Sequence, residues 1–169
     1  MSQLQIDFYG DPCASCGYGW SQADAPLLTE VLALPATYRA LVGHLPGTAR
    51  HPDLGWCASA YVLHVADNLR QHGERMAAGA HGETWRFEAP NQDELAELRR
   101  YERVPLDGAL WSLSGVVGPY VEAFLAARAA WGSTTPVARG DQDAGLVLRG
   151  NAHDAHHHAW DLERIAAAN

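Results

Sequence analysis

Apolar side chains recur every three or four residues in four long stretches of the chain, which is the spacing of an amphipathic helix. A shorter helix is predicted from Gln92 to Arg100, because its acidic residues come early and its arginines late, as the helix dipole favours. Alternating patterns, which would indicate strands, are almost absent. The long stretches run from residue 21 to 42, from 57 to 78, from 105 to 131, and from a cap at Asp141 or Asp143 to beyond Ile165.

Proline and glycine indicate where these helices bend or end. Pro35 and Pro119 fall inside predicted helices, and each is expected to bend its helix. Loops are predicted over residues 44–56, 79–91 and 132–143. Four principal helices joined by loops predict an all-α protein, an antiparallel four-helix bundle over residues 21–169. Residues 1–20 are predicted to be an irregular N-terminal segment.

Composition narrows the class of protein. A length of 169 residues, with 47% of them hydrophobic, suffices for one domain with a substantial core. The formal charge of −8 disfavours nucleic acid as a partner, because phosphates require a basic surface. No apolar run reaches the ~20 residues that cross a bilayer, and Met1–Asp7 lacks the parts of a signal peptide. Three cysteines, an odd number, favour a reducing cytoplasm over a disulfide framework.

Histidines cluster in the last predicted helix, where four of the nine lie between residues 153 and 158. His153 and His157 are four residues apart, so in a helix they project from one face and can share a metal ion. His156 could replace His157, whereas His158 is expected to point elsewhere. The alternative is a solvent-exposed histidine face, but the apolar residues around the cluster favour metal ligation.

A third imidazole is available in the second long helix. His64 adjoins its apolar stripe, and a lone histidine there is usually a hydrogen-bonded core residue. A bundle can nevertheless direct it toward His153 and His157. Three histidines would leave a divalent ion with an open position, the arrangement of catalytic zinc. Zinc is expected, with nickel and iron as alternatives that the spacing does not separate.

Two aspartates are candidates for a catalytic role beside that triad. Asp161 lies one turn beyond His157, and Asp67 lies three residues beyond His64. Either carboxylate could orient an imidazole, bind the ion directly, or assist proton transfer. For Asp161, a solvent-exposed salt bridge with Arg164 is an equally good interpretation.

A Cys13-x-x-Cys16-Gly17 motif lies in the N-terminal segment. It supplies half of a zinc knuckle and would need Cys57 or histidines to complete a second metal site. A redox motif would require a strand followed by a helix, which the pattern does not predict. An ordinary loop with two reduced thiols is the third interpretation, and the sequence leaves the three open.

Trp56, the Tyr61–Asp67 segment, the His153–His157 segment and Asp161 together resemble the DinB superfamily. These proteins are metal-binding four-helix bundles and include mycothiol-dependent maleylpyruvate isomerase and related thiol transferases. The similarity covers roughly residues 20–165, and the Cys-x-x-Cys segment also resembles a group of actinobacterial DinB-like proteins. The resemblance implies a metal triad of His64, His153 and His157. Cys57 stands where the resemblance leads us to expect a serine that caps the second helix.

The function expected from this resemblance is enzymatic. A zinc-type ion would activate a low-molecular-weight thiol such as mycothiol, which would then be transferred to a small electrophilic substrate or would isomerise it. The alternatives are a hydrolase that uses metal-bound water and a non-catalytic metal- or ligand-binding stress protein. Bundles of this size often pair through an exposed helix face, so a homodimer is a further expectation.

Overall fold

The computed structural model describes residues 3–81, 91–131 and 144–169, and no strand occurs within these ranges. This confirms the predicted all-helical class. The predicted cap at Asp141 or Asp143 lies outside the described residues. The elements are α1 (Gln3–Tyr9), α2 (Asp24–Val42), α3 (Ala58–Ala80), α4 (Gln92–Leu98), the 3-10 turn η1 (Tyr101–Arg103), α5 (Leu106–Trp131) and α6 (Ala144–Ala168).

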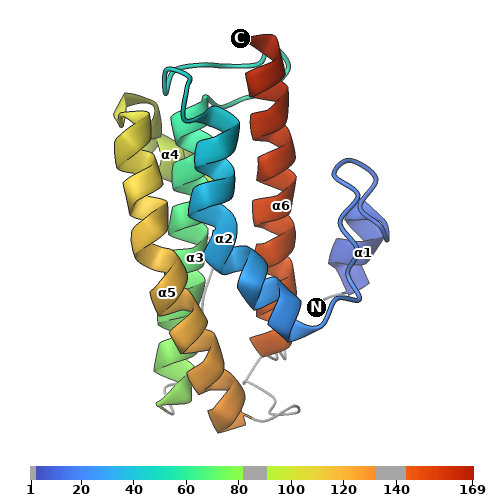
Figure 1. Ribbon diagram of the computed structural model, residues 1–169. Helices are drawn as coiled ribbons and strands as arrows, with labels where there is room; N and C mark the ends of the chain where they lie inside the picture. The colour runs from blue at the N-terminus through green and yellow to red at the C-terminus, as the bar shows by residue number, and fades with distance from the viewer. Residues whose placement is uncertain (1–2, 82–90, 132–143) are drawn as a thin grey trace.

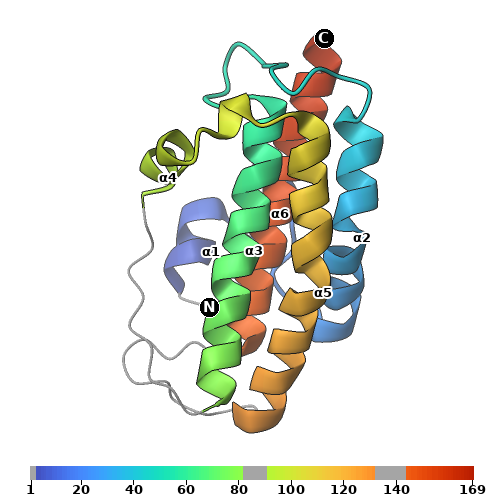
Figure 2. The same cartoon turned by 90° about the vertical axis from the view of Figure 1, so that its left-hand side faces the viewer.

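The four long helices α2, α3, α5 and α6 lie side by side in two views of the molecule (Figures 1 and 2). Helices α2 and α6 run in one direction and α3 and α5 in the other. The predicted antiparallel arrangement is therefore wrong for α3 and α5, which are parallel and share the most extensive helix–helix contact. The connection over residues 81–105 is long enough to return the chain to the end where α3 began, whereas a short loop would have forced an antiparallel pair.

Small and aromatic residues determine how closely α3 and α5 approach. A β-carbon added to Gly73 of α3 would lie 3.4 Å from the Cα of Tyr120 on α5, so a larger residue at position 73 would press on this contact. Tyr120 and Phe124 are each only 1% exposed. Burying one large apolar side chain stabilises a fold by about 1.5–3 kcal/mol, and many such side chains hold these helices together.

Both internal prolines lie within continuous helices. Helix α2 passes through Pro35 and changes direction along its length (Figure 1). Pro119 lies inside α5. Proline removes one backbone hydrogen bond and crowds the preceding turn, which explains a bend without a break.

The N-terminal segment is more ordered than the sequence predicted. It contains the short helix α1, whose seven residues are too few to show a clear periodic stripe. A loop then runs beside α6 (Figure 1). The indole of Trp20, 2% exposed, donates to the carbonyl of Gly10 over 2.8 Å, and the Tyr18 hydroxyl donates to the carbonyl of Arg149 on α6 over 3.2 Å. These contacts hold the segment against α6.

Helix α5 is long and apolar enough, by length and composition alone, to cross a membrane over Leu106–Ala130. The core helix of a water-soluble protein passes the same test. Because α5 packs against both α3 and α2, its apolar composition is accounted for by the helix assembly.

Candidate metal sites

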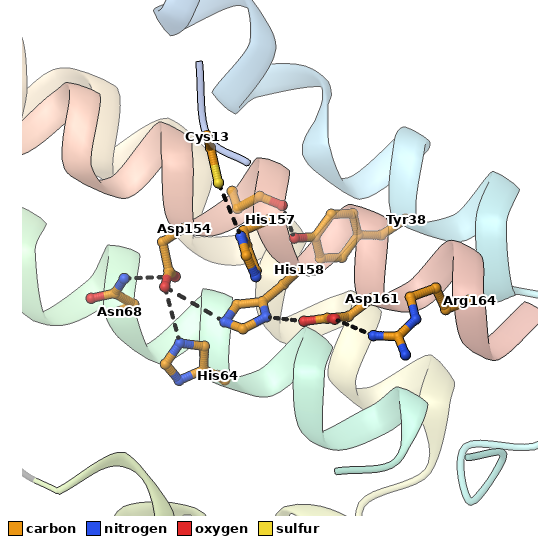
Figure 3. Close-up of polar contacts among 10 residues, drawn as sticks. Cys13, Tyr38, His64, Asn68, Asp154, His157, His158, Asp161 and Arg164 are labelled. Carbon is orange, nitrogen blue, oxygen red and sulfur yellow. Dashed lines mark hydrogen bonds and ion pairs between the residues drawn. The ribbon is translucent and has the colours of Figure 1, made fainter. Parts of the chain in front are cut away.

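Two groups of potential metal ligands lie along α6. The first, which we call the histidine–aspartate triad, consists of His64 from α3 with Asp154 and His158 from α6. One ligand atom from each lies within 4.8 Å of the other two. The Oδ1 atom of Asp154 is 3.4 Å from Nε2 of His64 and 3.6 Å from Nε2 of His158 (Figure 3). A carboxylate oxygen thus lies between two imidazole nitrogens of facing helices.

Further side chains fix the orientation of these ligands. Nδ1 of His158 is 2.9 Å from Oδ2 of Asp161, and Nδ2 of Asn68 donates to Oδ2 of Asp154 over 2.8 Å (Figure 3). Each contact is made by the second polar atom of the ligand, not by the atom that faces the other members of the triad. Imidazoles that bind metals commonly donate their other nitrogen to a carboxylate in this way, which fixes the ring and its tautomer.

The electrostatic field of the triad favours positive charge. Burial disfavours the charged form of His158, but the carboxylates of Asp154 and Asp161 outweigh this effect and raise its pKa to about 9. Burial acts against the Asp154 carboxylate too, yet His158 and His64 hold its pKa well below the usual range. Because a ligating imidazole must be neutral, a divalent cation bound between these groups would replace the proton of His158 and experience the same attraction.

The second group, which we call the cysteine–histidine group, contains Cys13 and Cys16 from the N-terminal loop and His153 and His157 from α6. One ligand atom from each of the four lies within 4.8 Å of the others. The Cys13 sulfur is 3.8 Å from Nδ1 of His157 (Figure 3). Two sulfurs and two nitrogens therefore face one another across the boundary between the loop and α6.

The protonation of this group suits metal binding. Burial, reinforced by the neighbouring His157, lowers the pKa of His153 to about 4, and burial also lowers the pKa of His157. Both imidazoles are therefore neutral at neutral pH, as a ligand must be. Burial alone would raise the pKa of the Cys13 thiol, but backbone N–H groups of Cys16 and Ser15 outweigh it and lower that pKa. Burial raises the pKa of Cys16 to about 11, so one thiol of the pair ionises before the other.

The structure does not gather the predicted triad into one group. His153 and His157 lie with the cysteines, whereas His64 lies with Asp154 and His158. Successive residues of a helix are rotated by about 100°, so residues 153 and 157 face one side of α6 and residues 154 and 158 another. The His153–His157 pair faces the N-terminal loop, and the side of α6 at residues 154 and 158 meets α3.

Sequence reasoning missed three residues of the triad and its surroundings: Asp154, His158 and Asn68. His158 was expected to point elsewhere, because only the His153–His157 spacing was considered. Asp154 and His158 are also four residues apart, and this second pair of potential ligands was the available signal. Asn68 is four residues beyond His64 and so lies on the same face of α3.

The two predicted catalytic aspartates have different surroundings. Asp161 contacts the imidazole of His158, not that of His157, and also lies 3.8 Å from Nη1 of Arg164. Asp161 therefore contacts an imidazole and also pairs with Arg164, but its side chain is only 8% exposed, so this ion pair is not the solvent-exposed one that the sequence suggested.

Asp67 forms its hydrogen bonds and its ion pair on the side of α3 that faces η1. Its carboxylate, 2% exposed, accepts hydrogen bonds from Arg70 and from the Tyr101 hydroxyl and forms an ion pair with Arg99 at 3.1 Å. These partners suit a structural role, and a catalytic role for Asp67 stays a prediction that its contacts do not favour.

Cys57 begins α3 and is fully buried, and its side chain makes no capping hydrogen bond. Neither ligand group includes it. It is surrounded like a small apolar residue, and with a thiol in place of the expected serine this end of α3 has no side-chain cap.

A pocket of about 460 Å³ is lined by residues around the start of α3 and by residues of α4 and η1, and the triad residues are not among them. Trp56 lines this pocket, and its ring centroid is 5.0 Å from that of His64. Charged residues of both signs also line it: Arg50, Arg100 and Arg103, and Asp93, Glu97 and Glu102. A volume of this size suits a small molecule.

Comparisons of the chain with protein-family models, with curated proteins and with solved structures gave no match. The function is therefore argued from the geometry of the two ligand groups.

Proposed function

We propose that this protein is a metal-dependent enzyme whose catalytic ion, of the zinc type, is held by His64, Asp154 and His158. The observation that carries the proposal is the approach of these three ligand atoms, from two facing helices, to within 4.8 Å of one another. Three protein ligands leave a position for an exogenous molecule, which is the arrangement of catalytic zinc sites. Nickel and iron accept the same ligands and remain alternatives.

The fit of the residues to an ion is supported by their surroundings. Asp161 and Asn68 contact the outer atoms of His158 and Asp154, which leaves the inner atoms directed at one point. The ligands are also unequally enclosed: the His64 side chain is 5% exposed and that of Asp154 is 27% exposed. One side of the triad is thus accessible to an incoming molecule.

The proposed reaction is thiol transfer or thiol-dependent isomerisation of a small electrophile, with mycothiol as the type of thiol. When bound, the ion would lower the pKa of the thiol and fix the position of its sulfur. The thiol loses its proton, and a sulfur electron pair forms a bond to the electrophilic carbon. In transfer, the leaving group departs with the electrons of the broken bond; in isomerisation, the sulfur itself departs after the substrate has changed geometry.

Residues of this chain would bind and orient the reactants. Asp161 holds the His158 ring, and Trp56 forms a wall shared by the triad and the pocket. The pocket carries both arginines and carboxylates, so it suits a polar small molecule.

We also propose that the fold is a four-helix bundle of the DinB type. The proposal is supported by four long helices lying side by side and by ligands supplied from the second and the last of them. It departs from the triad that the resemblance implied, because Asp154 and His158 replace His153 and His157. The cytoplasmic location and the homodimer stay predictions from the sequence.

Titration of the untagged, cobalt-loaded protein with mycothiol tests the proposed thiol activation. Binding of the thiol sulfur to cobalt should increase the near-ultraviolet charge-transfer absorption above that of the protein alone. The increment should vanish in His64→Ala and persist in His156→Ala, because His156 lies on α6 but belongs to neither ligand group.

Two outcomes would contradict the proposal. An increment that survives in His64→Ala would place the thiol at another site. Cobalt bound at the triad without any response to thiol would reject thiol activation and favour a hydrolase that uses water instead.

A further inference from the structure

The cysteine–histidine group has the composition of a closed metal site. It brings together two thiols spaced Cys-x-x-Cys and two imidazoles spaced His-x-x-x-His, all within 4.8 Å. Four such ligands in tetrahedral array are typical of structural zinc, which leaves no position for a substrate. Cys13 is 2% exposed and His153 is 4% exposed, whereas Cys16 and His157 are half-buried, so each side of the contact supplies one buried ligand.

The N-terminal loop is folded to present both sulfurs on one side. The N–H of Gly17 donates to the carbonyl of Cys13 over 2.8 Å, and the N–H of Cys13 donates to the carbonyl of Tyr18 over 2.8 Å. Gly17 adopts a φ of 75°, a left-handed conformation that side chains disfavour, and this allows the chain to turn back after Cys16.

The histidine side of the group contains a buried polar atom that lacks a protein partner. Nε2 of His153 makes no hydrogen bond within the part of the chain that the structure describes. The rings of Trp20 and Tyr9 lie 4.3 and 4.6 Å from the His153 ring, between centroids, and that of Tyr18 lies at 5.3 Å. These rings restrict access of water to the imidazole. A buried polar atom left without a partner is unfavourable, and a bound ion would supply a partner for this imidazole.

We infer that Cys13, Cys16, His153 and His157 form a second metal site, a structural zinc that fastens the N-terminal segment to α6. The inference does not depend on the proposed function, because the two groups share no ligand. The zinc would connect residues distant in the chain, about 140 positions apart. It would also fix the rotation of the turn of α6 that carries Asp154 and His158, which follow its two histidine ligands directly.

The metal content of the untagged full chain tests this inference. The wild-type protein should hold two equivalents of zinc, and Cys13→Ser and His157→Ala should each hold one. His158→Ala is the matched control, since it should lose the other equivalent and retain the charge-transfer absorption of cysteine-ligated cobalt. Circular dichroism establishes that each variant remains helical, so that loss of metal is not loss of the fold.

Chymotrypsin supplies a second measurement, because Tyr9, Tyr18 and Trp20 are potential cleavage sites in the anchored segment. Cleavage there should be faster in Cys13→Ser than in wild type, whereas His158→Ala should resemble wild type. The inference is overturned if Cys13→Ser holds as much metal as the wild-type protein. It is also overturned if thiol titration of freshly prepared wild-type protein finds Cys13 and Cys16 joined in a disulfide.

Discussion

The two ligand groups use adjacent residues of one helix but are completed by very different parts of the molecule. The cysteine–histidine group takes its other ligands from a folded N-terminal loop, and the histidine–aspartate triad takes its third ligand from the long helix α3. The first has four ligands and is enclosed by aromatic rings. The second has three, and the side chain of Asp154 is 27% exposed. Four ligands suit the cysteine–histidine group to a structural ion. Three ligands leave the ion of the histidine–aspartate triad an open position, which suits it to catalysis.

Two i, i+4 pairs offset by one residue can therefore serve two separate purposes. A rotation of about 100° between successive residues directs His153 and His157 toward the loop, and Asp154 and His158 toward α3. The two pairs are adjacent in the sequence, but one contacts the N-terminal loop and the other contacts α3.

The largest expected effect is the loss of the ion at the triad in His64→Ala. Removing one of three ligands should weaken binding by more than about 100-fold, a loss greater than that caused by mutating an outer contact. Competition with a chelator of known affinity measures it. His153→Ala should leave this affinity within a few-fold of wild type, and equal losses in both variants would indicate that the groups are not separate.

Loss of the structural ion should lower thermal stability. Binding at 100 to 1,000 times Kd stabilises a fold by about 2.7–4.1 kcal/mol, and each kcal/mol corresponds to about 2–4 °C in a chain of this size. Cys13→Ser should therefore reduce Tm by about 5–15 °C in zinc-containing buffer, as measured by calorimetry. After complete chelation, wild type and Cys13→Ser should unfold at similar temperatures; a difference that persists would assign the effect to packing of the thiol.

Asp161→Asn should weaken metal binding at the histidine–aspartate triad and leave the cysteine–histidine group unchanged. The amide keeps the size of the side chain but loses the charge that orients His158, so affinity at the triad should fall by about 10–100-fold. Cobalt titration distinguishes the two sites, because only the cysteine-ligated ion absorbs strongly in the near ultraviolet. A parallel loss of that absorption would show that Asp161 acts on α6 as a whole.

The smallest effect is expected for Asn68→Ala. It removes one hydrogen bond to Asp154 and leaves every ligand in place, so affinity at the triad should fall about tenfold or less. Competition titration again gives the value. An effect as large as that of His64→Ala would indicate that the amide of Asn68 itself ligates the ion.

The helical fold was predictable because its signals are local. The apolar period, the acidic start of α4 and the prolines inside α2 and α5 all act within a few residues. The parallel pairing of α3 and α5 was not predicted, because it depends on the path of a long connection. Helix α1 was missed because seven residues are too few for a periodic pattern.

The sequence by itself determined the helices, the two pairs of ligands four residues apart on α6, and the Cys-x-x-Cys turn. Only the tertiary structure decided which pair meets His64 and which meets the cysteines. The physical reason is that the spacing of side chains along a helix follows from backbone geometry alone. The rotation of that helix relative to its neighbours depends on packing among residues far apart in the chain, such as Trp20 against His153 and His64 beside Asp154.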